Sequence, residues 1–419
     1  MEQFIIQGGK PLCGKIMVDT AKNASLPIIA GTILTDEKIV LKNLPNISDV
    51  NKMLEILRTM GASIKKEGRD AIVDTSTINK TEIPSELAKE IRSSIFMLGP
   101  LLSKYRKATV AYPGGCDIGS RPIDLHLAGL RDLGVEIIED HVFIHCDATN
   151  MKSGLVHLDF PSVGATENIM MSAVLLDGET TIMNVAKEPE IVDLANFINM
   201  LGGCVRGAGT STIVVSGVKS LGGGEYQPMP DRIIAGTYLI SSAMTGGEIL
   251  LENACYQDVY ALLNKLRNAG ATIDYDQNSI YLKMRGRPIS CASIETQPFP
   301  GFPTDLQAQI LALQTISNGI SVITENLFET RFKHVPELLK MGAKITTRDR
   351  MAIVRGVPFL NGAEVVAHDL RGGAALVLAG LSAKDQTVVQ NVAYIDRGYE
   401  EFENKLQSLG ADIVRKWKK

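Results

Sequence analysis

The chain of 419 residues has no hydrophobic run long enough to cross a membrane. Its longest apolar runs, residues 169–176 and 374–381, are far shorter than the roughly 20 residues that a spanning helix needs. The opening residues 1–6 have neither a basic start nor a long apolar stretch, so no secretory signal is visible. We therefore expect these runs to be core segments, and we expect no membrane partner.

The sequence also lacks the spacings that mark metal sites and nucleotide-phosphate loops. It contains no Cys-x-x-Cys pair, no zinc spacing, and no Gly-x-Gly-x-x-Gly, Gly-x-x-x-x-Gly-Lys-Ser/Thr or His-Glu-x-x-His motif. The six cysteines are scattered: Cys13, Cys116, Cys146, Cys204, Cys255 and Cys291. We predict no metal, no cofactor and a location in the reducing cytoplasm.

An excess of positive charge is missing as well. Lys and Arg number 43 against 47 Asp and Glu, for a net charge of −4, which predicts no bulk affinity for nucleic acid. Any site for an anion must therefore be a local cluster of Lys and Arg. Hydrophobic residues at 45% and charged residues at 21% are ordinary globular usage, and the length favours two domains or one repeated architecture.

A repeated pattern is present instead. An apolar helix that ends in glycine and leads into a β-rich stretch occurs six times, with the glycines 68 to 73 residues apart. These glycines are Gly61, Gly134, Gly202, Gly270, Gly342 and Gly410. Before Gly61 the apolar residues fall at three- and four-residue spacing, which predicts an amphipathic helix that the glycine ends in a left-handed conformation. Alternating segments such as 71–74 and 279–282 predict strands, so the fold class is repeated α/β.

The densest Gly/Pro cluster, residues 222–230, predicts a linker that divides the repeats three and three. Two similar halves joined by a hinge would hold a ligand in the cleft between them.

Residues 112–125 place one thiol, Cys116, among three glycines and ahead of Arg121. Such a segment can fold over a substrate and move aside for the product. The alternative is a surface loop with an incidental cysteine.

Other basic residues stand beside turn-forming or small residues, where they either point into a cleft or face solvent. They include Lys22, Arg92, Arg331, Arg371 and Arg397. Asp305 follows a Pro/Gly-rich segment and precedes a predicted helix, 307–316. It is either the N-cap of that helix or a general base.

Together these residues resemble the UDP-N-acetylglucosamine 1-carboxyvinyltransferases, a family of enolpyruvyl transferases that open bacterial peptidoglycan synthesis. The resemblance runs from end to end. It is carried by the motifs Ala21-Lys22-Asn23-Ala24, Gly114-Gly115-Cys116, 121–126, 161–168, 188–193, 303–305, 334–337, 369–371 and 395–400. It implies a two-domain inside-out α/β barrel of three plus three repeats, with residues 22–229 as the first domain and 1–21 plus 230–419 as the second.

The resemblance also implies the site. Phosphoenolpyruvate would meet Lys22, Asn23, Arg121 and Arg397. The nucleotide sugar UDP-N-acetylglucosamine would meet Arg92, Arg121, Pro122, Ile123, Asp124, Leu125, Ser162, Val163, Asp305 and Leu327, and Arg371 is a further substrate-binding residue. The implied reaction is addition and elimination through a tetrahedral ketal, with Asp305 as base, Cys116 as acid and Lys22 stabilising developing charge.

The residue after Cys116 is Asp117, a position that is often alanine in this family. We expect the enzyme to react with alkylating inhibitors such as fosfomycin. A carboxylate at Asp117 would disfavour the thiolate if it points inward, and the rate of that reaction depends on this orientation. Two alternative functions stay open: 3-phosphoshikimate 1-carboxyvinyltransferase, and a catalytically silent paralogue that senses the nucleotide sugar.

Overall fold

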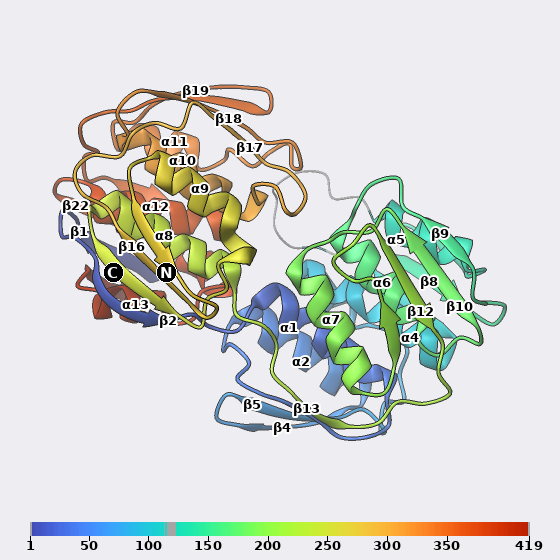
Figure 1. Ribbon diagram of the computed structural model, residues 1–419. Helices are drawn as coiled ribbons and strands as arrows, with labels where there is room; N and C mark the ends of the chain where they lie inside the picture. The colour runs from blue at the N-terminus through green and yellow to red at the C-terminus, as the bar shows by residue number, and fades with distance from the viewer. Residues whose placement is uncertain (1, 113, 115–122, 418–419) are drawn as a thin grey trace. The chain divides into compact units, whose positions relative to one another are not determined.

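The chain forms two compact units in the computed structural model, which describes residues 2–112, 114 and 123–417 (Figure 1). The first unit is built from residues 20–229. The second combines residues 2–19 with 230–417. Each unit has its own hydrophobic core. The assignment of residues 22–229 to one domain and of 1–21 plus 230–419 to another stays a prediction.

The described part of each unit contains three sheets, so the three-plus-three repeat is confirmed. The sheets of the first unit are, in strand order, β13 (Gly224–Tyr226), β3 (Ile39–Leu41), β5 (Asp70–Asp74) and β4 (Ser63–Glu67); β6 (Lys107–Ala111), β8 (Phe143–Asp147) and β7 (Glu136–Glu139); and β11 (Cys204–Arg206), β12 (Thr212–Ser216), β10 (Glu179–Met183) and β9 (Leu155–His157). Those of the second unit are β15 (Thr272–Tyr275), β16 (Ser279–Lys283), β14 (Glu248–Glu252) and β2 (Cys13–Met17); β17 (Ser293–Glu295), β18 (Ile320–Thr324), β20 (Met351–Arg355) and β19 (Lys344–Arg348); and β21 (Glu364–Val366), β22 (Gln386–Gln390), β1 (Glu2–Gln7) and β23 (Asp412–Trp417).

The N-terminal strand completes the last of these sheets. β1 pairs antiparallel with both β22 and β23, and its Phe4 and Ile6 are fully buried in the second core. The second unit therefore combines strands from both ends of the chain, with β1 and β2 from the N-terminal end and β23 from the C-terminal end.

Helices that are buried on nearly every side lie in the cores. They are α1 (Lys22–Gly31), α4 (Leu98–Tyr105) and α6 (Val163–Ala173) in the first unit, and α8 (Arg232–Thr245), α10 (Gln307–Ile316) and α12 (Leu370–Ser382) in the second. In the second unit all three pack on one another, and almost every side chain of α10 and α12 is buried. A helix without a polar face can be stable in water only when other elements cover it.

The amphipathic helices of the repeat end as the glycines predict. They are α2 (Ser48–Met60), α5 (Asp124–Asp132), α7 (Pro189–Met200), α9 (Tyr260–Asn268), α11 (Val335–Lys340) and α13 (Phe402–Ser408), and one further short helix is α3 (Ser85–Glu90). All six repeat glycines have positive φ, between 87° and 113°. This is the backbone region that side chains disfavour, so glycine is needed to turn each helix into its strand.

The predicted linker is partly wrong. Within 222–230, residues Gly224–Tyr226 form strand β13, which pairs in parallel with β3. Glycine-rich backbone can still form sheet hydrogen bonds, because the ladder uses main-chain groups alone. The chain passes between the two units at residues 19–20 and again at residues 229–230, after β13.

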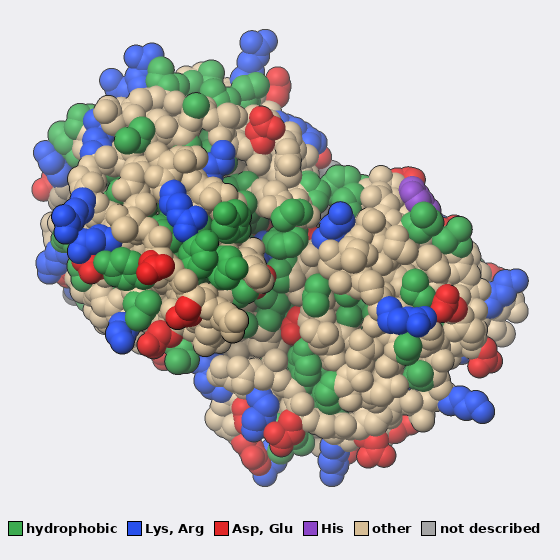
Figure 2. All heavy atoms as spheres, viewed as in Figure 1, with side chains coloured by type: hydrophobic (Ala, Val, Ile, Leu, Met, Phe, Trp, Pro, Cys, Tyr) green, Lys and Arg blue, Asp and Glu red, His purple; other side chains and the backbone are tan. Residues whose placement is uncertain are grey.

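Basic and acidic side chains lie interspersed over both units on the face that Figure 2 shows. Among the described residues, no helix combines the length and the apolar character needed to span a membrane.

Candidate active site

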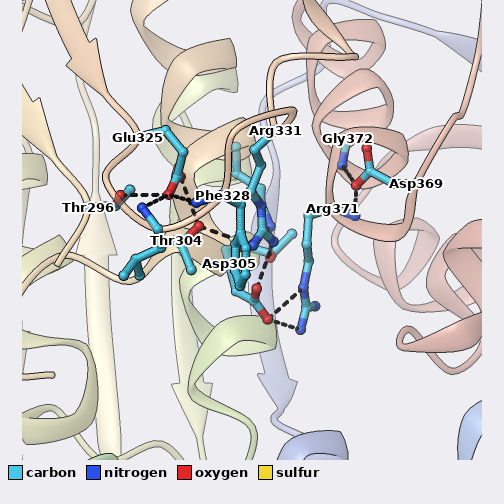
Figure 3. Close-up of polar contacts among 12 residues, drawn as sticks. Thr296, Thr304, Asp305, Glu325, Phe328, Arg331, Asp369, Arg371 and Gly372 are labelled. Atoms are coloured by element: carbon cyan, nitrogen blue, oxygen red, sulfur yellow. Dashed lines mark hydrogen bonds and ion pairs between the residues drawn. The ribbon is translucent and has the colours of Figure 1, made fainter. Parts of the chain in front are cut away.

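Asp305 lies between two arginines of the second unit (Figure 3). Arg331 Nη2 donates to Asp305 Oδ1 at 2.7 Å, and Arg371 donates to Oδ2 from Nη2 at 3.0 Å and from Nε at 3.3 Å. The alternative reading as a helix N-cap is wrong: α10 begins at Gln307, its N-cap is Leu306, and no side chain caps it. Two guanidinium groups favour the charged carboxylate, which is the form that can accept a proton.

Both arginines are held in place by buried structure. Their side chains are only 3% and 4% exposed, against 27% for Asp305. Arg371 lies in the first turn of α12, where the Asp369 carboxylate caps the helix by accepting from the backbone N–H groups of Arg371 and Gly372. Arg331 Nε and Arg371 Nη1 are buried without a hydrogen-bond partner among the described residues.

Two other predicted site residues of the second unit lie at the ends of short elements. Arg397 is the last residue of the 3₁₀ turn η5 (Val392–Arg397) and is partly buried. Leu327 follows β18, and its backbone N–H donates to Glu325 Oε1 at 2.9 Å.

Lys22 begins α1 in the first unit, directly before Asn23. Its Nζ lies 3.0 Å from Asp49 Oδ2, and the two side chains are only 14% and 5% exposed. Asp49 stands in the first turn of α2, where a carboxylate is favourable next to the positive helix end. The ion pair therefore restrains the Lys22 ammonium group at the start of α1.

A buried network joins the predicted residues of α5 to those of α6. Asn168 Oδ1 accepts from the Gly99 N–H at 2.9 Å, so the Asn168 amide donates to Ile95 O at 3.0 Å and faces His126 Nδ1 at 2.8 Å. His126 Nδ1 must then be the acceptor. A Cβ atom at Gly164 would lie 2.9 Å from the His126 ring, so only glycine permits this close approach.

This network brings Ile123, Asp124 and Leu125 at the start of α5 into the same part of the unit as Ser162 and Val163 at the start of α6. Ser162 is the N-cap of α6 and accepts from the Ala165 N–H at 3.4 Å. Arg92 begins the 3₁₀ turn η2 (Arg92–Met97) and is partly buried. Cys116, Arg121 and Pro122, and with them the predicted lid, lie outside the described residues.

Glu167 of α6 is a fully buried acid whose two carboxyl oxygens have no hydrogen-bond partner among the described residues. Burial, reinforced by the negative charges of Glu190 and Glu188, raises the pKa of Glu167 well above its usual value. Folding therefore favours the neutral form of this side chain.

Replacing Glu167 with glutamine should raise the melting temperature at pH 8 and change it much less at pH 4. The unfolded carboxyl loses its proton above about pH 4.3 whereas the folded one holds its proton to higher pH, so this group costs stability as the pH rises. The neutral amide removes that cost, by about 2–4 °C for each kcal/mol relieved. Thermal unfolding at both pH values tests this; an equal shift at both would contradict it.

Sequence reasoning did not single out Asp49 or Glu325; it named Arg331 only among the basic residues beside turns, and Asn168 only within the motif 161–168. A usable signal existed for Asn168, which is a polar residue directly ahead of the apolar run 169–176. The importance of Asp49 and Arg331 follows only from their partners, which are distant in sequence. Among residues 2–112, 114 and 123–417, no group of His, Cys, Asp and Glu side chains is arranged to hold a metal ion.

Comparison with known proteins shows the family. The family described as EPSP synthase (3-phosphoshikimate 1-carboxyvinyltransferase) matches residues 6–406. UDP-N-acetylglucosamine 1-carboxyvinyltransferase 2 of Caldanaerobacter subterraneus subsp. tengcongensis is 49% identical over 99% of this chain and 100% of its own length. The UDP-N-acetylglucosamine 1-carboxyvinyltransferase of Idiomarina loihiensis is 48% identical over 99% of both chains.

Solved structures show the same fold. The enolpyruvyl transferase NikO from Streptomyces tendae is 22% identical and superposes with a TM-score of 0.88 over 99% of this chain and 98% of its own. EPSP synthase from Acinetobacter baumannii is 17% identical with a TM-score of 0.77 over the whole of both chains. With this fold and with relatives nearly half identical from end to end, the chain belongs to the enolpyruvyl transferase family, in the group of the UDP-N-acetylglucosamine 1-carboxyvinyltransferases.

Proposed function

We propose that this enzyme transfers the enolpyruvyl group of phosphoenolpyruvate to the 3′-hydroxyl of UDP-N-acetylglucosamine and releases phosphate. This would be the first committed step of peptidoglycan synthesis. The observation that carries the proposal is the 48–49% identity, over the full length, to enzymes named for this reaction. The shikimate-pathway alternative is less well supported, because the EPSP synthase structures are only 16–17% identical.

The proposal assigns the anionic groups of the substrates to basic side chains. Lys22, Asn23, Arg121 and Arg397 would bind phosphoenolpyruvate, whose phosphate and carboxylate need positive partners. Residues that would bind the nucleotide sugar are Arg92, Arg121, Pro122, Ile123, Asp124, Leu125, Ser162, Val163, Asp305 and Leu327. In the second unit, the buried guanidinium groups of Arg331 and Arg371 place positive charge beside Asp305.

In the addition step, Asp305 would take the proton of the 3′-hydroxyl as that oxygen bonds to the central carbon of phosphoenolpyruvate, and Cys116 would give a proton to the methylene carbon. The product is a tetrahedral ketal that carries a methyl group. In the elimination step that methyl group would return a proton to the Cys116 thiolate, the carbon–oxygen bond to phosphate would break to leave the enol ether, and phosphate would depart with the proton held by Asp305. Lys22 would stabilise the charge that develops on the enolpyruvyl oxygen.

We also propose that the enzyme is located in the cytoplasm. The five cysteines within the described residues are free thiols, as a reducing compartment keeps them.

Phosphate release tests the proposed function. The purified enzyme with phosphoenolpyruvate should release phosphate when UDP-N-acetylglucosamine is added and should not do so with 3-phosphoshikimate. Release with 3-phosphoshikimate alone would assign the chain to the alternative reaction. Binding of the nucleotide sugar without release from either acceptor would favour the sensor.

Exchange of the proposed acid, Cys116→Ser, should lower kcat by about 10²–10⁴-fold and leave the affinity for UDP-N-acetylglucosamine nearly unchanged. A serine hydroxyl gives up its proton far less readily than a thiol of pKa about 8.5. Cys146→Ser, at a buried thiol of β8, is the control for thiol loss and should leave the catalytic constants near those of the unaltered enzyme. Equal losses of turnover and affinity in Cys116→Ser would assign the thiol to packing.

A further inference from the structure

Glu325 is a fully buried carboxylate directly after β18. Its Oε1 atom accepts from Thr296 Oγ1 at 2.9 Å and from the backbone N–H groups of Leu327 at 2.9 Å and Phe328 at 3.2 Å. Its Oε2 atom accepts from Thr304 Oγ1 at 2.8 Å. A buried charge is costly unless hydrogen bonds surround it, and here both oxygens are satisfied by neutral donors.

These donors come from segments that carry proposed site residues. Leu327 is a proposed contact of the nucleotide sugar, and Thr304 immediately precedes Asp305 in the 3₁₀ turn η4 (Thr304–Leu306). Figure 3 shows Glu325 above both Thr304 and Asp305, with dashed contacts that lead from one to the next.

The hydrogen bonds from Glu325 to Asp305 have a defined direction. A carboxylate only accepts, so the Thr304 hydroxyl must donate its proton to Glu325. The lone pairs of Thr304 Oγ1 then face Arg331 Nη1, which donates at 3.1 Å, and Arg331 Nη2 donates to Asp305. The Arg331 guanidinium carbon also lies 5.4 Å from the centre of the Phe328 ring. The backbone N–H of Phe328 is one of the groups that donate to Glu325.

We propose that Glu325 is a positioning residue for enolpyruvyl transfer: through Thr304 it orients Arg331, and hence the Asp305 carboxylate, while its other oxygen fixes the Leu327 backbone. This inference rests on the proposed function. The Glu325 carboxylate would thereby position both Asp305, the proposed base, and Leu327, a proposed contact of UDP-N-acetylglucosamine. No proton passes along the chain; its role is orientation.

The hydroxyl of Thr304 provides the sharpest test, because valine has the same shape without the hydroxyl. Thr304→Val should lower kcat about 10- to 100-fold, the size of one lost hydrogen bond to a charged group. The KM for UDP-N-acetylglucosamine should change less than about twofold, since Leu327 keeps its partner. Thr304→Ser restores the hydroxyl and should recover most of kcat. An unchanged kcat in Thr304→Val, or equal losses in both variants, would overturn the proposal.

Glu325→Gln tests the same chain from its other end. The amide oxygen can still accept from Leu327 and Phe328, whereas the amide NH₂ faces Thr304 and removes its acceptor. We expect kcat to fall as in Thr304→Val, and the double variant to lose no more than either single one. Glu329→Gln, on the same loop in an exposed ion pair with Arg350, is the matched control and should leave kcat unchanged.

The melting temperature of each variant shows whether a loss of kcat comes from unfolding instead. If Glu325→Gln does not fold, the Thr304→Val and Thr304→Ser pair decides alone. Failure of the unaltered enzyme to release phosphate would refute the proposed function, whereas an active enzyme with an unaffected Thr304→Val variant would refute only the positioning role.

Discussion

Replacing Asp305 with asparagine should reduce kcat by about 10²–10⁴-fold, the usual contribution of a general base. The amide has the size of the carboxylate and its oxygen can still accept from Arg331, but it takes up no proton at neutral pH. The KM values should change little, because the basic side chains that would bind the substrates remain. Steady-state phosphate release with both substrates varied measures kcat and KM separately.

Asp412→Asn is the control for this experiment. Asp412 forms an exposed ion pair with Lys10 in the same unit, so its loss should leave turnover unchanged. Asp305→Ala should be at least as inactive and less stable, since Arg331 and Arg371 would be buried without a carboxylate partner. Near-normal turnover of Asp305→Asn would remove Asp305 from the role of base.

Replacing Lys22 with glutamine should lower kcat/KM by about 10²–10³-fold. The ammonium group is restrained by Asp49 at the start of α1, so its charge is already positioned before the transition state forms. Glutamine can still donate a hydrogen bond to Asp49 but carries no charge to stabilise the enolpyruvyl oxygen. Single-turnover rates at saturating phosphoenolpyruvate show how much of the loss occurs in the chemical step.

Lys42→Gln is the matched control, because Lys42 also pairs with an aspartate, Asp70, but in a more exposed position than Lys22. A similar decrease in both lysine variants would indicate a general electrostatic effect and would contradict a specific role for Lys22. A loss confined to Lys22→Gln, and partial loss in Asp49→Asn, would support positioning of the ammonium group by Asp49.

Helix boundaries that depend only on neighbouring residues were predictable from the sequence. The six helix-ending glycines all have the expected positive φ, because a helix stop depends on the few residues around it. The helix after Asp305 begins and ends as predicted, at Gln307 and Ile316. The same local reasoning was wrong for residues 224–226, since pairing with β3 outweighs the turn preference of glycine.

The sequence by itself determined the α/β repeat, its division into three plus three and the identity of the family, because periodic apolar residues, glycines and motifs are properties of the chain alone. Only the tertiary structure decided what the polar residues do. Asp305 meets Arg331 from 26 residues away and Arg371 from 66 residues away, and Lys22 meets Asp49 across two helices. Such partners depend on which helix and strand ends the packed core brings together, and no local preference encodes that.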